Sequence, residues 1–267
     1  MNIEKLTSKD FFEKLDKQIV DEEISEILEI SDELIKLSNN KTINYCLGKK
    51  KGAKEKPTAR VLNNWINSGI VQIDNKDRGK IKRFNVLESI WLNILVELRD
   101  FGISIESIKR TRKTLFDYKV ENFSLFKFHI INSIIREEQT LVVFKNGEAQ
   151  IMSTDTYLLF LYKNKFESHL SFRLIDFIIP EFSNHALNKN ILISNPFENI
   201  QKMKLLFLLK TGCFQHLKIR LSGQDVRYIE NSEMITKNID VASAISNWNF
   251  ETIVVSIDND VETIITL

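Results

Sequence analysis

Residues 57–118 hold an ordered series of helix patterns separated by stop signals, and this order constrains the fold more than any other part of the chain. Apolar residues recur at helical spacing in three stretches, which begin near residues 59, 86 and 105. Gly69 and Gly102 follow the first two stretches, and Ser104 precedes the third as a candidate N-cap. With only 3 prolines and 8 glycines in 267 residues, the chain belongs to neither the disordered nor the collagen-like class.

A basic hairpin is predicted between the first two helices. Residues 70–73 form a short strand pattern, DNKDRG is a turn pattern, and KIKRF at residues 80–84 predicts the returning strand. The predicted order is therefore helix, glycine stop, basic hairpin, long helix, glycine and capped helix.

The net charge of +1 conceals a strong asymmetry along the chain. Residues 1–40 carry 5 lysines and arginines against 11 acids, residues 41–120 carry 18 against 8, and residues 121–267 carry 14 against 17. A basic block between two acidic ones is typical of a segment that binds a polyanion. A solvated basic face without a partner is the alternative interpretation of the charge alone.

The basic segment resembles the winged helix-turn-helix of the MerR superfamily of bacterial transcription regulators. The resemblance rests on RVLNNWINSGIV at residues 60–71, GKIKRFNVLE at residues 79–88 and LRDFGISIESIK at residues 98–109. It implies a module over about residues 42–115 that binds double-stranded DNA as part of a homodimer. Family members usually continue into a long dimerising helix, for which only residues 124–138 are available here.

The first helix of this module supplies the candidate reading face. Its apolar residues are expected to point inward, and they are Val61, Leu62, Trp65 and Ile66. Five polar residues then remain for DNA: Thr58, Arg60, Asn63, Asn64 and Asn67. In the major groove, arginine pairs with guanine and asparagine with adenine, each worth about 1–3 kcal/mol of discrimination. A surface ion pair is the structural alternative for Arg60.

Phosphate contacts set register and add salt-dependent affinity. We expect them from the basic residues of the loop and hairpin, which are Lys49, Lys50, Lys51, Lys54, Lys56, Lys80, Lys82 and Arg83. Arg110, Arg112 and Lys113 are expected to extend the same face.

The flanking regions favour other structures. Residues 19–38 predict an amphipathic helix with an acidic face, which ends at Asn39–Asn40. Residues 195–212 predict a helix between a cap at Asn195 and a stop at Gly212. The apolar runs at residues 157–162 and 205–209 are expected to be core. Three hairpins are predicted after residue 120, and they turn at Asn146–Gly147, Ser222–Gly223 and residues 258–260.

The expected fold class is α+β, with a helical N-terminal region, the winged helix-turn-helix and a C-terminal α+β domain of antiparallel hairpins. The domain boundaries that follow are 1–40 for the acidic extension, 41–120 for the DNA-binding domain and 121–267 for the C-terminal domain. The C-terminal domain is expected to oligomerise, sense a small ligand or bind a protein partner.

Several function classes lack a sequence signal. The chain shows no nucleotide-binding, metalloprotease or hydrolase motif, so we expect no enzyme and no cofactor. The two cysteines, Cys46 and Cys213, lie far apart and predict neither a disulfide framework nor a metal site. The acids at residues 258–262 lack the other ligands of a calcium loop. Without a signal sequence or a membrane-spanning run, a cytoplasmic, nucleoid-associated protein is expected.

The function expected from these patterns is a sequence-specific DNA-binding protein of the MerR-like regulator type, acting as a homodimer. An accessory protein of a phage or mobile element, similar to an excisionase, is an alternative. A third hypothesis treats the module as a targeting device for a C-terminal interaction or enzyme domain.

Overall fold

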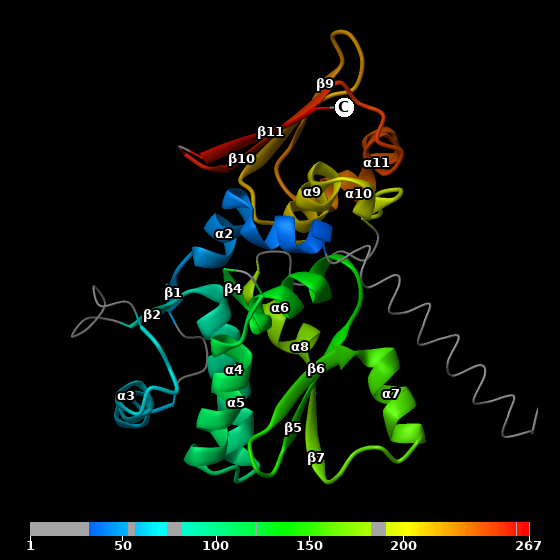
Figure 1. Ribbon diagram of the computed structural model, residues 1–267. Coiled ribbons are helices and arrows are strands. Elements are labelled where there is room, and N and C mark those ends of the chain that lie inside the picture. Colours follow the sequence, from blue (N-terminus) through cyan, green and yellow to red (C-terminus); the bar gives the residue numbers. More distant parts are fainter. Residues whose placement is uncertain are drawn as a thin grey trace, which may run out of the picture.

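The computed structural model describes residues 32–52, 57–73, 82–120, 122–182, 191–259 and 261–266 (Figure 1). The fold is α+β with antiparallel sheets, as the sequence predicted. A three-stranded and a four-stranded sheet lie at opposite ends of the molecule, and helices fill the space between them (Figure 1). Among the described helices, none combines the length and apolar character needed to cross a membrane.

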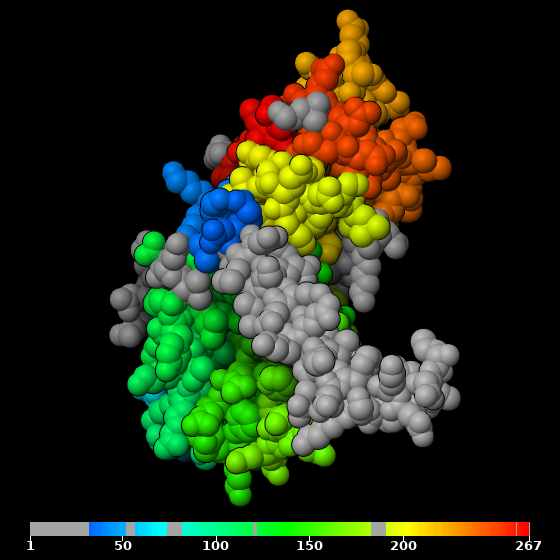
Figure 2. All heavy atoms as spheres, turned by 45° about the vertical axis from the view of Figure 1, so that its right-hand side comes forward, coloured from blue at the N-terminus to red at the C-terminus, as the bar shows by residue number. Residues whose placement is uncertain are grey.

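The described chain begins with helical residues 32–39. They confirm the later part of the helix predicted for residues 19–38, whose earlier part lies outside the described residues. Asn40 then caps α2 (Lys41–Gly48), because its side-chain oxygen accepts the backbone N–H of Thr42 at 2.9 Å. In Figure 2 this N-terminal segment lies directly against α9 (Ile200–Thr211), the yellow helix of the C-terminal half.

Three helices of the predicted module form as the sequence indicated, namely α3 (Ala59–Asn67), α4 (Val86–Asp100) and α5 (Ile105–Asp117). A polar side chain caps the N-terminus of each, and the caps are Thr58, Asn85 and Ser104. Gly69 and Gly102 follow α3 and α4 with φ values of 79° and 80°, in the left-handed region that glycine enters without strain.

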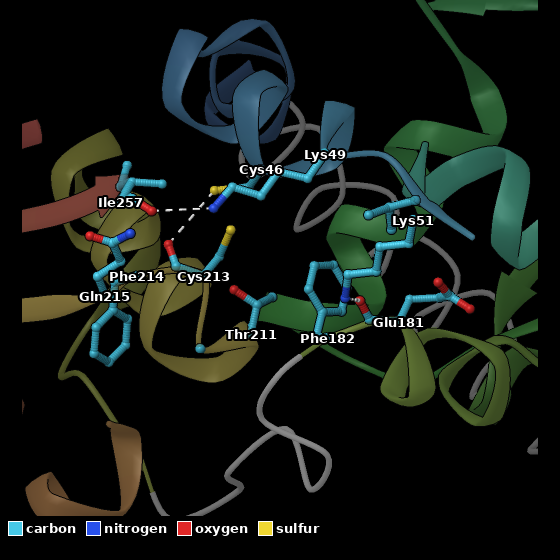
Figure 3. A pocket seen from close by; sticks show the side chains of 12 residues that line it. Cys46, Lys49, Lys51, Glu181, Phe182, Thr211, Cys213, Phe214, Gln215 and Ile257 are labelled. Atoms are coloured by element: carbon cyan, nitrogen blue, oxygen red, sulfur yellow. Dashed lines mark hydrogen bonds between the residues drawn. The ribbon is translucent and has the colours of Figure 1, made fainter. Parts of the chain in front are cut away.

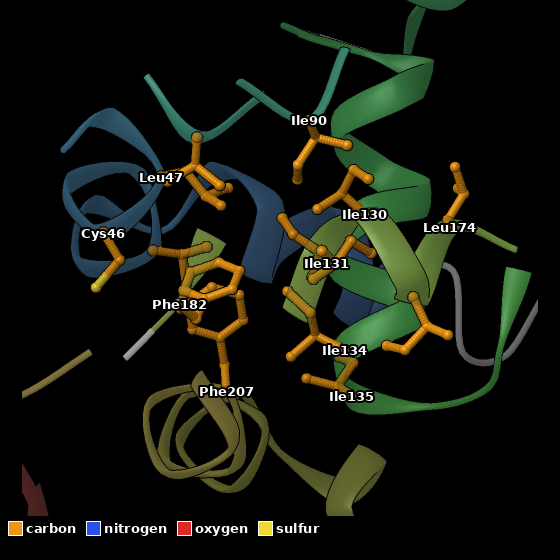
Figure 4. Packing of buried hydrophobic residues seen from close by; sticks show 14 of the residues in the cluster. Cys46, Leu47, Ile90, Ile130, Ile131, Ile134, Ile135, Leu174, Phe182 and Phe207 are labelled. Carbon is orange, nitrogen blue, oxygen red and sulfur yellow. The ribbon is translucent and has the colours of Figure 1, made fainter. Parts of the chain in front are cut away.

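Helix α6 (Leu125–Ile135) is the central helix of the molecule. Two short paired strands, β3 (Lys119–Val120) and β4 (Phe123–Ser124), lead into it. Most of its apolar side chains are buried, and the helix packs against α5, α8 (Leu174–Ile178) and α9 (Figure 4). Residues 124–138 are the only stretch available for the dimerising helix of the family, and the core of the single chain already packs against α6 within this stretch. The same buried cluster crosses the expected boundary at residue 120.

The three-stranded sheet has the order β6-β5-β7. Its strands are β5 (Gln139–Phe144), β6 (Ala149–Ser153) and β7 (His169–Arg173). The β5–β6 hairpin turns at Asn146–Gly147 as predicted, with Gly147 at a φ of 88°. After β7 the chain continues through α8 into the short 3-10 helix η3 (Ile179–Glu181).

Helix α7 (Thr154–Tyr162) connects β6 to β7 and lies on the outside of the molecule (Figure 1). The expectation that residues 157–162 are core is wrong, since Leu158 is 54% exposed and Tyr162 is 85% exposed. The physical reason is that α7 packs against β5 and β6 of the small sheet with one side, which leaves the side chains of Leu158, Phe160, Leu161 and Tyr162 exposed.

The four-stranded sheet has the order β11-β10-β8-β9. Its strands are β8 (His216–Arg220), β9 (Val226–Ile229), β10 (Thr252–Asp258) and β11 (Val261–Thr266). The hairpin positions are as predicted, although residue 260 lies outside the described residues. The accompanying helices are the 3-10 helix η4 (Pro196–Glu198), α9, α10 (Ser232–Lys237) and α11 (Ile239–Ser246).

Helix α9 confirms the predicted core run and corrects its predicted cap. Residues 205–209 are buried, as expected, and Gly212 ends the helix at a φ of 64°. The N-cap is Asn199 and not Asn195, since the Asn199 side chain accepts the Lys202 N–H at 2.9 Å. Asn195 instead precedes η4 in a left-handed conformation.

Candidate nucleic-acid interface

The buried side of α3 anchors this helix to the rest of the protein. Leu62 and Trp65 are buried, and Ile66 packs against the core. Val61, which was expected to point inward, is 38% exposed. It lies at the edge of the apolar stripe, because one residue along an α-helix turns the side chain by about 100° away from Leu62.

The polar residues that the sequence proposed for base reading are one N-cap residue, Thr58, and four residues of α3 on the side away from Leu62 and Trp65. Thr58, Arg60, Asn63, Asn64 and Asn67 are all exposed. Arg60 is the only charged residue in 57–73 and forms no ion pair within the described part of the chain. Thr58 is partly engaged, since its Oγ1 accepts the Val61 N–H at 3.4 Å. The result is a short helix with a firmly packed apolar side and a free polar side.

The chain after α3 is a loop, which corrects the strand predicted for residues 70–73. The backbone N–H groups of Ile70 and Val71 both donate to the Trp65 carbonyl, at 3.1 and 3.3 Å. The Ile70 carbonyl accepts the indole N–H of Trp91 at 2.6 Å. These backbone groups are therefore used to end α3 and to hold it against α4, so they do not pair with a second strand.

A buried ion pair fixes this loop from the other side. Arg112 donates to both carboxylate oxygens of Glu88, at 2.7 and 3.2 Å, and its guanidinium lies 4.1 Å from the ring centre of Phe116. The Glu88 carboxylate also accepts the backbone N–H of Gln72 at 3.1 Å. The expectation that Arg112 extends the DNA face is therefore wrong, since Arg112 joins α5 to α4 in the interior.

Arg110 and Lys113 are the neighbouring basic residues of α5. The Arg110 guanidinium donates to the Asn146 carbonyl at 3.2 Å, which holds the β5–β6 turn against α5. Lys113 is exposed.

The predicted hairpin is replaced by a different pairing in the described residues. The returning strand β2 (Arg83–Phe84) pairs with β1 (Lys51–Gly52), which comes from the lysine-rich loop. Phe84 is buried and anchors this pair, while Arg83 is exposed and Lys82 is half-buried. The base of the predicted hairpin is therefore formed by β2 together with β1 of the lysine-rich loop. Lys80, Lys54 and Lys56 lie outside the described residues.

Two lysines of the loop lie in a cavity of about 230 Å³ rather than beside α3 (Figure 3). Lys49 Nζ donates to the Ile257 carbonyl at 3.2 Å and lies 4.0 Å from a carboxylate oxygen of Asp258. Lys51 Nζ donates to the Glu181 carbonyl at 2.7 Å. Both ammonium groups bind the C-terminal half of the chain, which reduces their availability to phosphate. Lys50, between them, is exposed.

The same cavity brings together the two cysteines, which the sequence did not connect. Cys46 from α2 is buried, and its thiol donates to the Cys213 carbonyl at 3.9 Å (Figure 3). The neighbouring Cys46 thiol lowers the pKa of Cys213, and the positive charges of Lys49 and Lys51 act in the same direction, while burial opposes them. The contact with Cys213, together with burial, raises the pKa of Cys46. No local spacing signal could have predicted this pair, because 167 residues separate its members.

The acids at the β10–β11 turn are engaged within the protein. Asp258 accepts the Tyr45 hydroxyl at 2.8 Å, and Glu262 accepts the Ser256 hydroxyl at 2.6 Å. In the described ranges no group of three or more histidine, cysteine or acidic side chains is placed to hold a metal ion. Comparisons of the chain with protein-family models, curated proteins and solved structures found no match.

Proposed function

We propose that this protein binds double-stranded DNA sequence-specifically, with α3 as the reading helix, as a MerR-like transcription regulator that acts as a homodimer. The observation that carries the proposal is the free polar side of α3. Arg60, Asn63, Asn64 and Asn67 stand exposed along one short helix that is packed rigidly from behind. A helix of this size fits the major groove, where these side chains match the edges of guanine and adenine.

The electrostatics of α3 support the same proposal. No acidic residue occurs between residues 57 and 73, so the face meets no carboxylate of its own when it approaches phosphates. The α3 N-terminus is also exposed at Ala59, Arg60 and Val61, and helix N-termini favour phosphate oxygens. Within the described loop and hairpin, Lys50, Lys51 and Arg83 are exposed, and Lys51 donates to the Glu181 carbonyl, so we assign the first phosphate contact to Arg83.

The test is selection from sheared genomic DNA with the full-length protein at two salt concentrations. Arg60→Ala is compared with Arg220→Ala, which removes the same charge from β8 in the distant four-stranded sheet (Figure 1). We expect wild type and Arg220→Ala to enrich one sequence motif. Arg60→Ala is expected to bind that motif about 5- to 100-fold more weakly, as one lost arginine–guanine pair implies.

Equal loss in both variants, or binding at low salt without any enriched motif, would mean that the protein contacts only phosphates, and it would refute the proposal. The arrangement of an enriched motif then separates the regulator from the accessory-protein alternative. Two half-sites related by symmetry near promoters support a homodimeric regulator. Clustered direct sites near a recombination end support the mobile-element role.

A further inference from the structure

Cys46 and Cys213 are the only two cysteines in the chain, and the fold places them in one cavity. Cys46 projects from α2, and Cys213 belongs to the corner between α9 and β8 (Figure 3). The Cys46 thiol donates to the Cys213 carbonyl at 3.9 Å, and both cysteines are free. This contact joins α2 to the corner between α9 and β8.

The two thiols have different surroundings. Cys213 is half-buried, whereas Cys46 is 1% exposed. The ammonium groups of Lys49 and Lys51 line the same cavity and stabilise a negative charge at Cys213. Since the thiolate is the nucleophilic form of cysteine, Cys213 is the member of the pair that is both activated and accessible. Cys46 is the neighbour that can resolve an oxidised Cys213.

We propose that Cys213 and Cys46 form a peroxide-reactive thiol pair, in which Cys213 is the attacking and Cys46 the resolving residue. The Cys213 thiolate attacks one oxygen of a hydroperoxide, and the O–O bond breaks. The leaving oxygen takes a proton and departs as water when the oxidant is hydrogen peroxide, which leaves Cys213 as a sulfenic acid. The Cys46 sulfur then attacks the Cys213 sulfur, an S–S bond forms, and the hydroxyl leaves as a second water with the Cys46 proton.

The overall step converts two thiols and one hydrogen peroxide into one disulfide and two waters. A dithiol reductant returns the disulfide to two thiols by thiol–disulfide exchange and is itself oxidised to a disulfide. The product covalently ties α2 to the corner between α9 and β8. This inference does not depend on DNA binding, and its test reads the cysteines directly.

The experiment uses the reduced full-length protein, treated with one equivalent of hydrogen peroxide at low protein concentration. Remaining thiols are alkylated, and intact mass and proteolytic peptides are analysed by mass spectrometry. We expect loss of two hydrogen masses, no alkylation, and a peptide that joins Cys46 to Cys213 within one chain. Dithiothreitol should restore two alkylation sites.

Single variants assign the roles. Cys46→Ser should trap Cys213 as a sulfenic acid, detected as a dimedone adduct, and Cys213→Ser should leave Cys46 unoxidised under the same conditions. Lys49→Met, which keeps the aliphatic stem, should slow oxidation several-fold, whereas Lys165→Met on the exposed loop after α7 should not. Circular dichroism confirms that each variant is folded.

Three results would overturn the proposal. The first is two alkylated thiols in wild type after peroxide. The second is a disulfide found only between separate chains. The third is a Cys46 that is oxidised as readily in Cys213→Ser as the pair is in wild type.

Discussion

The ion pair between Glu88 and Arg112 allows a direct test of what holds α4, α5 and the loop after α3 together. Both side chains are almost fully buried, with exposed fractions of 9% for Glu88 and 6% for Arg112. The carboxylate has two charged hydrogen bonds from Arg112 and one from the Gln72 backbone. Removal of the guanidinium therefore leaves a buried carboxylate with one neutral donor.

Arg112→Met is expected to lower the free energy of unfolding by about 3–5 kcal/mol, the usual cost of breaking a buried ion pair from one side. Glu88→Gln leaves the guanidinium without its counter-charge and should cost a comparable amount. The double variant Glu88→Gln/Arg112→Met removes both charges, and its amide oxygen can still accept the Gln72 N–H. We expect the free energy of unfolding of the double variant to lie within about 2 kcal/mol of the wild-type value.

Urea unfolding at pH 7, followed by circular dichroism, measures these differences as shifts of the midpoint at constant slope. The exposed pair Glu233–Lys237 on α10 is the control, with exposed fractions of 78% and 77%. Lys237→Met should change the free energy of unfolding by less than about 0.5 kcal/mol. Two results would refute this explanation. In the first, each single variant lowers the free energy of unfolding by less than about 1 kcal/mol. In the second, the double variant lowers it by the sum of the two single losses.

Two further predictions concern a close approach of two backbones and a half-buried histidine. A Cβ on Gly147 would lie 2.1 Å from the Ser107 carbonyl oxygen at a φ of +88°, so Gly147→Ala should destabilise by about 2 kcal/mol or more in urea unfolding. Gly223→Ala, at a φ of +55° in open space, should cost only about 1 kcal/mol, and equal costs would contradict the steric explanation. Burial lowers the pKa of His129 from 6.5 to about 4, against a weaker opposing effect of its hydrogen bond with Gln139. Protonation therefore favours the unfolded chain, and the free energy of unfolding should fall by up to about 3 kcal/mol as pH drops from about 6.5 to about 4. His129→Gln should show a smaller fall over that range, and parallel pH curves for the two proteins would exclude this role.

The sequence determined the local structure of the module because the signals for helix ends act over only a few residues. Thr58, Asn85 and Ser104 each cap a helix through their own side-chain oxygen, and Gly102 ends α4 at a positive φ. These contacts need no distant partner, so the ordered series of helices could be predicted. The β5–β6 turn at Asn146–Gly147 was predictable for the same reason.

Which of these residues face the outside depends on how distant elements pack together. Arg112 and Lys113 are adjacent basic residues on α5. Arg112 is buried, with its guanidinium bound to Glu88 of α4, whereas Lys113 is exposed. Residues 157–162 and 205–209 are similarly apolar, yet the second run is buried within the core and the first packs with one side only against β5 and β6. In each comparison the residues are of similar type, so their burial depends on which other elements pack nearby.

The candidate sites divide in the same way. The polar residues of α3 were found from the sequence, because helical periodicity alone separates Asn63 and Asn64 from Leu62 and Trp65. The pair of Cys46 and Cys213 was not, because it depends on the packing of α2 against α9 and on the turn at Gly212. A periodic pattern along one helix is a local property, whereas a contact across 167 residues exists only once the chain has folded.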